Sequence, residues 1–232
     1  MTLPIKGIQK TSLVDYPGKV SCTIFLGGCD FRCPYCQNRD LVLNYQNMPT
    51  IKEEEVLDFL KKKIKWLDGV CITGGEPLLH KEIIDFIKKI KKIGLLVKVD
   101  TNGSRPELLK KIIDNNLVDY IAMDIKAPLE KYDNAVRVKV DKEKIKKSVD
   151  LLKENKVDYE FRTTVVPDFF KEEDAVEIGK WLKNSKKYCL QQFRPMNTLD
   201  KAYEKKKPYP IEKFSEFKKI LEKYIDKVEV RV

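Results

Sequence analysis

Three closely spaced cysteines, Cys29, Cys33 and Cys36, are the residues of this chain best suited to chemistry. Thiolates that close together on a loop usually hold a metal, but a [4Fe–4S] cluster held entirely by protein takes four cysteines. Three cysteines would leave one iron without a protein ligand, and an open coordination position is where a small molecule can bind and react. A structural zinc site is the alternative. It needs a fourth ligand, and the only histidine of the chain is His80.

The other three cysteines, Cys22, Cys71 and Cys189, lie singly in apolar, strand-like runs. A lone cysteine in such a run is usually a small buried side chain. Because the chain is expected to be intracellular, its six cysteines favour metal or redox chemistry over disulfide bonds.

Length and composition indicate one domain spanning residues 1–232. The chain has 232 residues, 42% of them hydrophobic, which is enough for one sizeable core. The N-terminal segment lacks the apolar h-region of a signal peptide, and no apolar stretch approaches the roughly 20 residues that a membrane span needs. We therefore expect a soluble, cytoplasmic protein with no membrane partner.

The formal net charge of +10 leaves the kind of partner open. Clustered Lys and Arg side chains neutralise phosphates, so a basic chain can bind nucleic acid. Here only seven of the 46 basic residues are Arg, and the Lys residues lie mainly on predicted helix faces, interleaved with core positions. This pattern is typical of solvated helix faces. We expect no nucleic acid partner, whereas an acidic protein partner or a redox donor fits the charge.

Short apolar or β-branched runs alternate along the chain with longer amphipathic runs, the pattern of repeated βα units around a parallel sheet. The predicted strands are Val20–Leu26, Val70–Thr73, Leu95–Thr101, Tyr120–Ile125, Tyr159–Val165, Tyr188–Gln192 and Val228–Val232. The predicted helices are Lys52–Lys65, Lys81–Ile93, Pro106–Asn115, Lys142–Asn155, Lys171–Lys183 and Ile211–Tyr224. Thr50, followed by Glu53, suggests a capping box, and Pro106 suits a first helical position.

About six such units are too few for a closed eight-fold barrel, so the predicted fold is α/β, an open partial TIM barrel with a parallel sheet. In parallel α/β folds the chemistry lies at the carboxyl ends of the strands. Every candidate motif of this chain falls at such an end.

Polar motifs follow three of the predicted strands. They are Thr73-Gly74-Gly75-Glu76-Pro77, Asp100-Thr101-Asn102-Gly103 and Met123-Asp124-Ile125-Lys126. Each, taken alone, is also common turn chemistry. The next strand carries Arg162, and an arginine inside an apolar strand either forms a buried salt bridge or reaches a charged ligand.

The spacing Cys-x3-Cys-x2-Cys with Tyr35 before the third cysteine resembles the signature of radical S-adenosylmethionine enzymes, and Gly74-Gly75-Glu76-Pro77 resembles the GGEP motif of that family. The resemblance implies that S-adenosylmethionine chelates the open iron of a [4Fe–4S] cluster held by Cys29, Cys33 and Cys36. One electron then cleaves this cofactor to a 5′-deoxyadenosyl radical. The protein has to bind the cofactor, exclude water and tune the potential of the cluster.

The same resemblance implies the cofactor contacts. The implied set is Tyr35, Gly74, Gly75, Glu76, Asp100, Asn102, Asp124, Lys126, Arg162 and Val165. Gly74 and Gly75 would allow close approach to the ammonium group, and Tyr35 and Val165 would lie near the adenine. Asp100, Thr101 and Asp124 could also hold a monovalent cation. For Val165, ordinary core packing is the alternative.

From residue 14 to the sixth strand the chain resembles, within that family, the glycyl-radical enzyme activating group, and most closely the short forms that activate anaerobic ribonucleoside-triphosphate reductase. Two departures stand out. Gln37 occupies the position where many activators have histidine, and Arg194 lies where a proline-tyrosine-histidine stretch is found in the pyruvate formate-lyase activators. Arg194 is therefore a candidate cofactor contact of this chain.

The implied function is removal of a hydrogen atom from a glycine of a partner glycyl-radical enzyme. Asp15 could hydrogen-bond the partner's loop, or be a turn residue before Pro17. A small-molecule substrate, such as a deazapurine precursor, is one alternative, and a non-catalytic iron–sulfur electron carrier is another. The chain has no second cysteine cluster, so we expect electrons from an external donor such as flavodoxin or ferredoxin. We expect His80 to be a solvated or capping residue.

Overall fold

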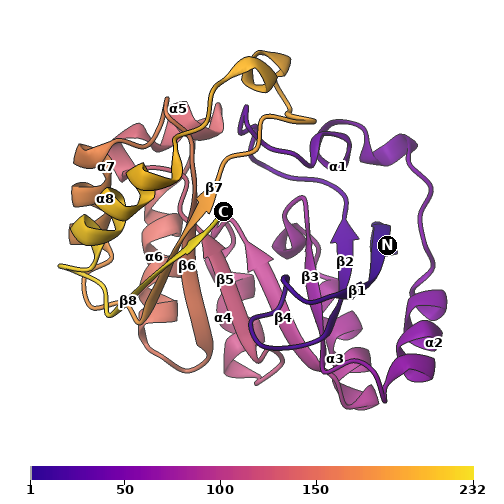
Figure 1. Cartoon of the computed structure of the whole chain (residues 1–232). Helices are drawn as coiled ribbons and strands as arrows, with labels where there is room; N and C mark the ends of the chain where they lie inside the picture. Colours follow the sequence, from indigo (N-terminus) through magenta and orange to yellow (C-terminus); the bar gives the residue numbers. More distant parts are fainter. Residues whose placement is uncertain (1) are drawn as a thin grey trace.

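The structure is a computed structural model that describes residues 2–232. Eight strands form one curved sheet whose spatial order follows the chain (Figure 1). The strands are β1 (Ile5–Ser12), β2 (Ser21–Leu26), β3 (Gly69–Gly74), β4 (Leu96–Thr101), β5 (Tyr120–Asp124), β6 (Asp158–Val165), β7 (Lys187–Gln192) and β8 (Lys227–Arg231). Strands β2 to β8 are parallel neighbours, and β1 is antiparallel to β2. Because β1 and β8 do not pair within residues 2–232, the barrel is open, which confirms the predicted fold class.

Helices connect the parallel strands along the convex side of the sheet (Figure 1). They are α1 (Arg39–Leu43), α2 (Glu53–Lys63), α3 (Ile83–Ile93), α4 (Pro106–Asp114), α5 (Tyr132–Val136), α6 (Lys142–Lys153), α7 (Glu172–Trp181) and α8 (Ile211–Leu221). The six predicted helices are all present, with ends shifted by a few residues. α1 and α5 were not predicted because five residues are too few to show a helical repeat of apolar positions.

Strand β1 was missed by the sequence prediction for a physical reason. It lies at the edge of the sheet, and only its two end residues, Ile5 and Ser12, are buried. Its sequence therefore lacks the alternation of apolar and polar residues that marks a half-buried strand. Its register with β2 also shifts twice, which is typical of irregular edge strands.

One of the two helix-start signals was correct. Pro106 occupies the first turn of α4, as predicted. The capping box at Thr50 was wrong, because α2 begins at Glu53 and the Thr50 hydroxyl instead accepts a 2.7 Å hydrogen bond from Lys6 Nζ. Thr50 therefore ties the start of this segment to β1 rather than capping the helix.

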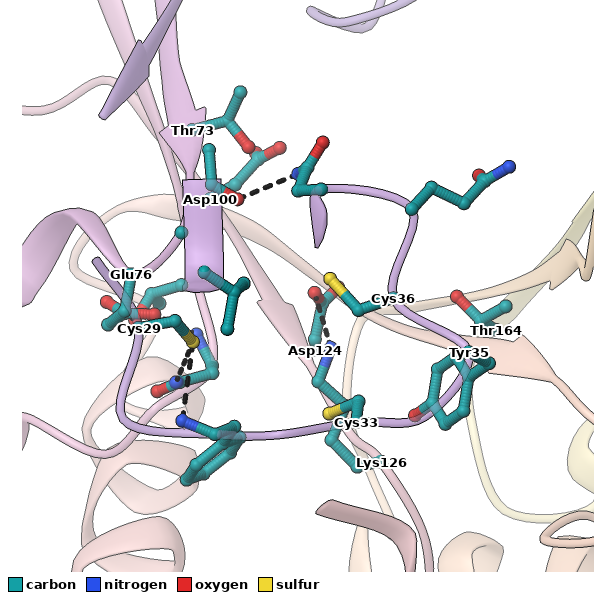
Figure 2. Close-up of a pocket in the computed structure, with 18 of the residues that line it drawn as sticks. Cys29, Cys33, Tyr35, Cys36, Thr73, Glu76, Asp100, Asp124, Lys126 and Thr164 are labelled. Carbon is teal, nitrogen blue, oxygen red and sulfur yellow. Dashed lines mark hydrogen bonds and ion pairs between the residues drawn. The ribbon is translucent and has the colours of Figure 1, made fainter. Parts of the chain in front are cut away.

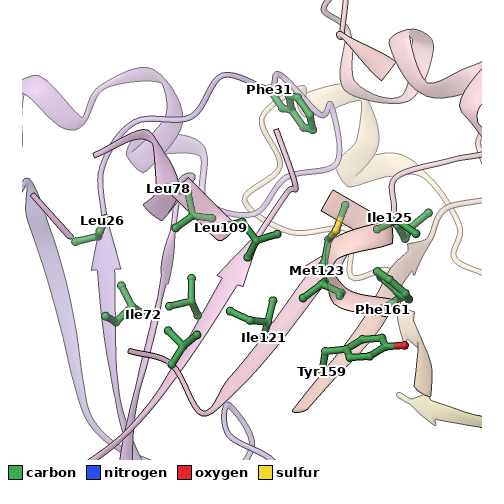
Figure 3. Close-up of a cluster of buried hydrophobic side chains, with 14 of the residues drawn as sticks. Leu26, Phe31, Ile72, Leu78, Leu109, Ile121, Met123, Ile125, Tyr159 and Phe161 are labelled. Atoms are coloured by element: carbon green, nitrogen blue, oxygen red, sulfur yellow. The ribbon is translucent and has the colours of Figure 1, made fainter. Parts of the chain in front are cut away.

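The apolar core fills the space between the sheet and its helices. Ile72, Ile121 and Phe161 on the strands are fully buried (Figure 3). Phe86 on α3 is fully buried as well. Full burial of one such side chain contributes about 1.5–3 kcal/mol. The three isolated cysteines, Cys22 on β2, Cys71 on β3 and Cys189 on β7, are buried, as predicted, and form no disulfide bond.

The concave face of the sheet is polar instead. Arg162 on β6 contacts Asp100 on β4 at 3.2 Å, across the intervening strand β5, so both side chains lie on the same inner face of the sheet. Lower in the same face, Arg231 on β8 forms two hydrogen bonds with the fully buried Glu160. The fold therefore concentrates charged side chains inside the barrel. Over the described residues, no helix is long and apolar enough to cross a membrane.

Candidate active site

A pocket opens at the carboxyl ends of the parallel strands, where the sequence motifs converge (Figure 2). The predicted residues that line it are Cys29, Cys33, Tyr35, Cys36, Gly74, Gly75, Glu76, Asp100, Thr101, Asn102, Asp124, Lys126, Arg162 and Arg194. These residues come from the cysteine loop, from the ends of β3, β4, β5 and β6, and from the segment after β7. Segments far apart in the chain thus meet in one cavity.

The cysteine loop follows β2 directly and is fixed by the chain around it. The backbone N–H of Arg32 donates to Val136 at the end of α5, and the side chain of Arg32 donates to the carbonyl oxygen of Cys29. The carbonyl of Cys36 accepts from the N–H of Leu199. Figure 2 shows the three sulfur atoms on the inner side of this loop. All three thiols are free.

The chemistry of the thiols fits a bound metal cluster. Burial raises the pKa of Cys33 to about 11, against the opposing charge of Lys126, so the thiol requires a cation in contact with it to become a thiolate at neutral pH. Within residues 2–232, no three His, Cys, Asp or Glu side chains lie close enough to hold a single metal ion. A fourth zinc ligand is not supplied by His80, which ends a short 3-10 turn and points its Nε2 at the Gly27 carbonyl, 2.8 Å away. The three thiols therefore fit a cluster with three protein ligands better than a zinc ion.

The end of β3 packs directly on the cysteine loop. The N–H of Gly75 donates to Leu26, and the N–H of Glu76 donates to the Gly28 carbonyl at 2.7 Å. Asn38, just after the third cysteine, donates to the Gly74 carbonyl at 2.8 Å. A Cβ atom built on Gly75 would overlap the backbone carbonyl of Gly28. Glycine is therefore required at position 75 by the close approach of two backbones.

Gly75→Ala is expected to displace the cysteine loop and to reduce cluster incorporation at least several-fold, because neither backbone segment can move aside freely. The iron and sulfide content after anaerobic reconstitution measures this. Gly7→Ala in β1 is the matched control, since its Cβ would meet the Phe25 side chain at an ordinary 3.6 Å. Equal iron content in the two variants would contradict the packing argument.

The carboxylate of Glu76 is buried and joins the ends of β3 and β4. It accepts hydrogen bonds from the N–H of Leu78, the hydroxyl of Thr101 and the N–H of Asn102, at 3.0, 2.8 and 2.7 Å. The Asn102 side chain in turn donates to Asp30 at 2.9 Å, within the cysteine loop. Glu76 lines the pocket, yet its oxygens are engaged by the protein's own donors, so its side chain sets the position of the loops.

Burial raises the pKa of Glu76 to about 8, although its three hydrogen-bond donors oppose the shift. The folded-state pKa lies above the ordinary value of 4.5, so the stabilising contribution of Glu76 is present below pH 4.5 and is lost as the pH rises toward 8. We expect the free energy of unfolding of the wild type, relative to Glu76→Gln, to fall by up to about 1.4 kcal/mol per pH unit across this window. Urea unfolding of both proteins at several pH values measures the difference, and a difference that rises with pH would contradict the assignment.

An alternating row of partly buried charges forms the wall opposite the cysteine loop. Arg162 Nε donates to Asp124 at 2.6 Å and its terminal nitrogen lies 3.2 Å from Asp100. Lys126 lies 3.0 Å from Asp124, and Lys98 forms a close ion pair with Asp100. Burial by itself would raise the pKa of Asp124, but Arg162 and Lys126 hold it well below its ordinary value. Arg162 and Lys98 likewise lower the pKa of Asp100 against the effect of burial, so both carboxylates are anionic at neutral pH.

The residues predicted for a monovalent cation contact the protein's own groups in this structure. The carboxylates of Asp100 and Asp124 face the guanidinium of Arg162, and the hydroxyl of Thr101 donates to Glu76. The positive charge between the two carboxylates is thus supplied by the protein. The sequence could not show these contacts, because it does not reveal which side chains pair across the sheet.

Two predicted contacts lie outside the pocket. Val165 is fully buried in the hydrophobic core, and its neighbour Thr164 lines the pocket instead, because successive strand residues face opposite sides of the sheet. Asp15 accepts a 2.6 Å hydrogen bond from Thr23 and lies in the β1–β2 connection, at the amino end of β2. Its carboxylate therefore contacts β2 and does not line the pocket.

Arg194 and Tyr35 complete the pocket on the side of β7. Arg194 is exposed at the rim, and its carbonyl accepts from the side chain of Gln37 at 3.3 Å. The ring of Tyr35 is buried and packs 5.9 Å from that of Phe169. Several lining residues were not predicted: Phe31, Asn38, Val42, Thr73, Thr164 and Phe193. The alternation of strand residues around Arg162 could have identified Thr164.

An open parallel barrel whose strand ends enclose a three-cysteine loop and a row of partly buried charges defines a class of cofactor-dependent enzymes. Residues 23–182 match the model of the Radical SAM superfamily, and the chain belongs to this superfamily. Membership implies a [4Fe–4S] cluster and S-adenosylmethionine as cofactors.

Relatives indicate a narrower group. A protein of Methanocaldococcus jannaschii, provisionally named a glycyl-radical enzyme activating enzyme, is 41% identical over 98% of this chain and 95% of its own length. The pyruvate formate-lyase-activating enzyme of Listeria monocytogenes is 29% identical over 53% of this chain and 52% of its own. A solved domain of a pyruvate-formate lyase-activating enzyme from Bacteroides vulgatus shares the fold, with a TM-score of 0.57 and 20% identity over 71% of this chain and 99% of that domain.

Proposed function

We propose that this chain is a glycyl-radical enzyme activating enzyme, which cleaves S-adenosylmethionine reductively and removes a hydrogen atom from a glycine of a partner enzyme. One observation carries the proposal: three free thiols and an alternating row of partly buried charges line the same pocket. When bound, the cluster supplies the electron that breaks a carbon–sulfur bond of S-adenosylmethionine and releases the 5′-deoxyadenosyl radical. The near full-length relative supports the choice of a protein substrate.

The residues of the pocket suit a ligand that carries charges of both signs. Cys29, Cys33 and Cys36 would hold three irons of the cluster. The ammonium of Lys126 suits the ligand carboxylate, and the anionic Asp100 and Asp124 suit its hydroxyl and ammonium groups. Backbone groups at the end of β3 complete the contacts with the ligand ammonium. The ring of Tyr35 and the apolar rings near it offer a flat surface for the adenine.

A protein substrate fits the open side of the barrel, because a peptide loop has to reach the pocket from outside. The proposed partner is an anaerobic ribonucleoside-triphosphate reductase, and the proposed electron donor is a flavodoxin or a ferredoxin. A monovalent cation has no part in the proposal, since Arg162 already lies between the two carboxylates.

Anaerobic reconstitution tests the proposal. The protein is loaded with iron and sulfide and given S-adenosylmethionine and dithionite, and 5′-deoxyadenosine is expected. A correctly formed cluster that gives no 5′-deoxyadenosine would contradict enzymatic cleavage and favour a simple electron carrier. The activated mixture is then combined with the anaerobic ribonucleotide reductase of the same organism, and the electron paramagnetic resonance spectrum is expected to show a glycyl doublet. Cleavage without a doublet in any glycyl-radical enzyme of that organism would favour a small-molecule substrate.

A further inference from the structure

A shallow groove lies on the outer side of the cysteine loop, separated from the candidate active site by one side chain. Its lining residues are Asp30, Phe31, Ser104, Arg105, Val138, Lys139, Val140, Asp141 and Lys144. Phe31 lines both this groove and the active-site pocket, and it is only 4% exposed. Figure 3 shows its ring above the apolar layer, on the side of the cysteine loop. The ring of Phe31 therefore lies between the groove and the active-site pocket.

Three cationic side chains, Arg105, Lys139 and Lys144, and two carboxylates line the groove, so its net charge is positive. Of its two carboxylates, that of Asp30 lies 3.2 Å from Arg105, and that of Asp141 caps the first turn of α6. Lys139 and Lys144 have no ion-pair partner in the part of the chain that the structure describes. Both ammonium groups are therefore available to an acidic surface.

Two hydrogen-bonding groups at the groove also lack partners. Among residues 2–232, three buried side-chain nitrogen or oxygen atoms have no hydrogen-bond partner, and two of them are Ser104 Oγ and Arg105 Nε. Ser104 is 8% exposed and lines the groove. Both groups can donate, and buried donors of this kind are seldom left unsatisfied. The two lysines are groups of the groove that an acceptor such as a carboxylate oxygen can reach from solvent.

We propose that this groove is the docking site of an acidic one-electron carrier protein that reduces the cluster. The inference rests on the cofactors of the proposed function. S-adenosylmethionine and the partner's glycine loop would occupy the mouth of the active-site pocket, so electrons have to arrive through another wall, and the buried ring of Phe31 is shared by that pocket and this groove. The carrier loses one electron and the cluster gains it, and no bond or proton moves. The net charge of +10 favours encounter with an acidic carrier.

Charge reversal in the groove tests the proposal. The test variant carries Lys139→Glu and Lys144→Glu. The control carries Lys219→Glu and Lys223→Glu on and just after α8, two exposed lysines whose reversal changes the net charge equally. The rate of cluster reduction is followed by the bleaching of its visible absorbance. The reductants are flavodoxin hydroquinone and a reduced low-potential ferredoxin, each at low ionic strength, with dithionite as a small reductant that needs no docking site.

At low ionic strength we expect the groove variant to be reduced by both carriers about tenfold or more slowly, and the control variant within twofold of wild type. Dithionite is expected to reduce all three proteins alike. Calorimetry with the oxidised carriers and the protein without cluster gives a second readout, in which only the groove variant should lose affinity.

Three outcomes would overturn the proposal. Equal slowing of both variants would assign the effect to net charge, and normal reduction of the groove variant would exclude docking there. Normal reduction with loss of the glycyl signal would assign the groove to the substrate enzyme instead. A wild-type cluster that dithionite does not reduce would count against the proposed function. The calorimetric measurement of carrier binding would still show whether the carrier docks in the groove.

Discussion

Cys33→Ala is expected to abolish the cluster and, with it, all formation of 5′-deoxyadenosine. Cys33 is 6% exposed in the middle of the cysteine loop, flanked by two further thiols of the same pocket. Two thiolates are too few to hold a cluster whose three-cysteine site already leaves one iron open. The visible absorbance and the iron content of the reconstituted protein, measured with the product, check the expectation.

Cys22→Ala is the matched control for this experiment. Cys22 is fully buried in β2 and lies outside the pocket, so its loss removes only a small apolar side chain. We expect full iron content and a destabilisation of about 1 kcal/mol. If Cys22→Ala lost iron to the same extent as Cys33→Ala, loss of folding rather than loss of a ligand would explain both variants.

Arg162→Gln is expected to have the second largest effect. Arg162 neutralises Asp100 and Asp124 at once, and its side chain is 13% exposed. Removing one partner of a buried ion pair leaves uncompensated charge and costs about 3–5 kcal/mol of stability. The lost charge-assisted contacts should also weaken S-adenosylmethionine binding by about tenfold or more. Thermal unfolding and calorimetric titration of the cluster-loaded protein measure the two effects.

Arg231→Gln separates the effect on stability from the effect on binding. Arg231 pairs with the buried Glu160 in the same concave face, but it does not line the pocket. Because Lys187 also pairs with Glu160, we expect a smaller loss of stability, about 2 kcal/mol, and an unchanged affinity for S-adenosylmethionine. An equal loss of affinity in Arg231→Gln and Arg162→Gln would show that general destabilisation, not the pocket contact, weakens binding.

The sequence predicts most of the active site because the relevant signals are local. The cysteine loop is one short run, and each polar motif directly follows a predicted strand. In a parallel sheet the carboxyl ends of the strands meet at one edge, so Cys33, Glu76 and Asp124 had to lie near one another once the strands were placed. Residues that follow strands can therefore be assigned to a common pocket without knowledge of their contacts.

The part of the active site that the sequence does not predict depends on contacts between distant segments of the chain. The sequence left Arg162 open between a salt bridge and a ligand contact, and the structure shows a side chain that pairs with two carboxylates and also lines the pocket. Val165 lies in the core, its predicted alternative, and the strand alternation around Arg162 already pointed to Thr164. Asp15 lies outside the pocket, because the end of the barrel at which a loop lies is set by tertiary structure. Strand β1 was missed because an edge strand need not show an apolar pattern.

Deuterium transfer from the partner tests the proposed function most directly. The partner glycyl-radical enzyme is produced with glycine deuterated at Cα and is mixed anaerobically with this protein, S-adenosylmethionine and a reductant. The proposed hydrogen abstraction predicts 5′-deoxyadenosine that carries one deuterium atom, in amounts matching the glycyl signal, as measured by mass spectrometry. 5′-Deoxyadenosine that stays unlabelled with every deuterated glycyl-radical enzyme of the organism would contradict the proposal.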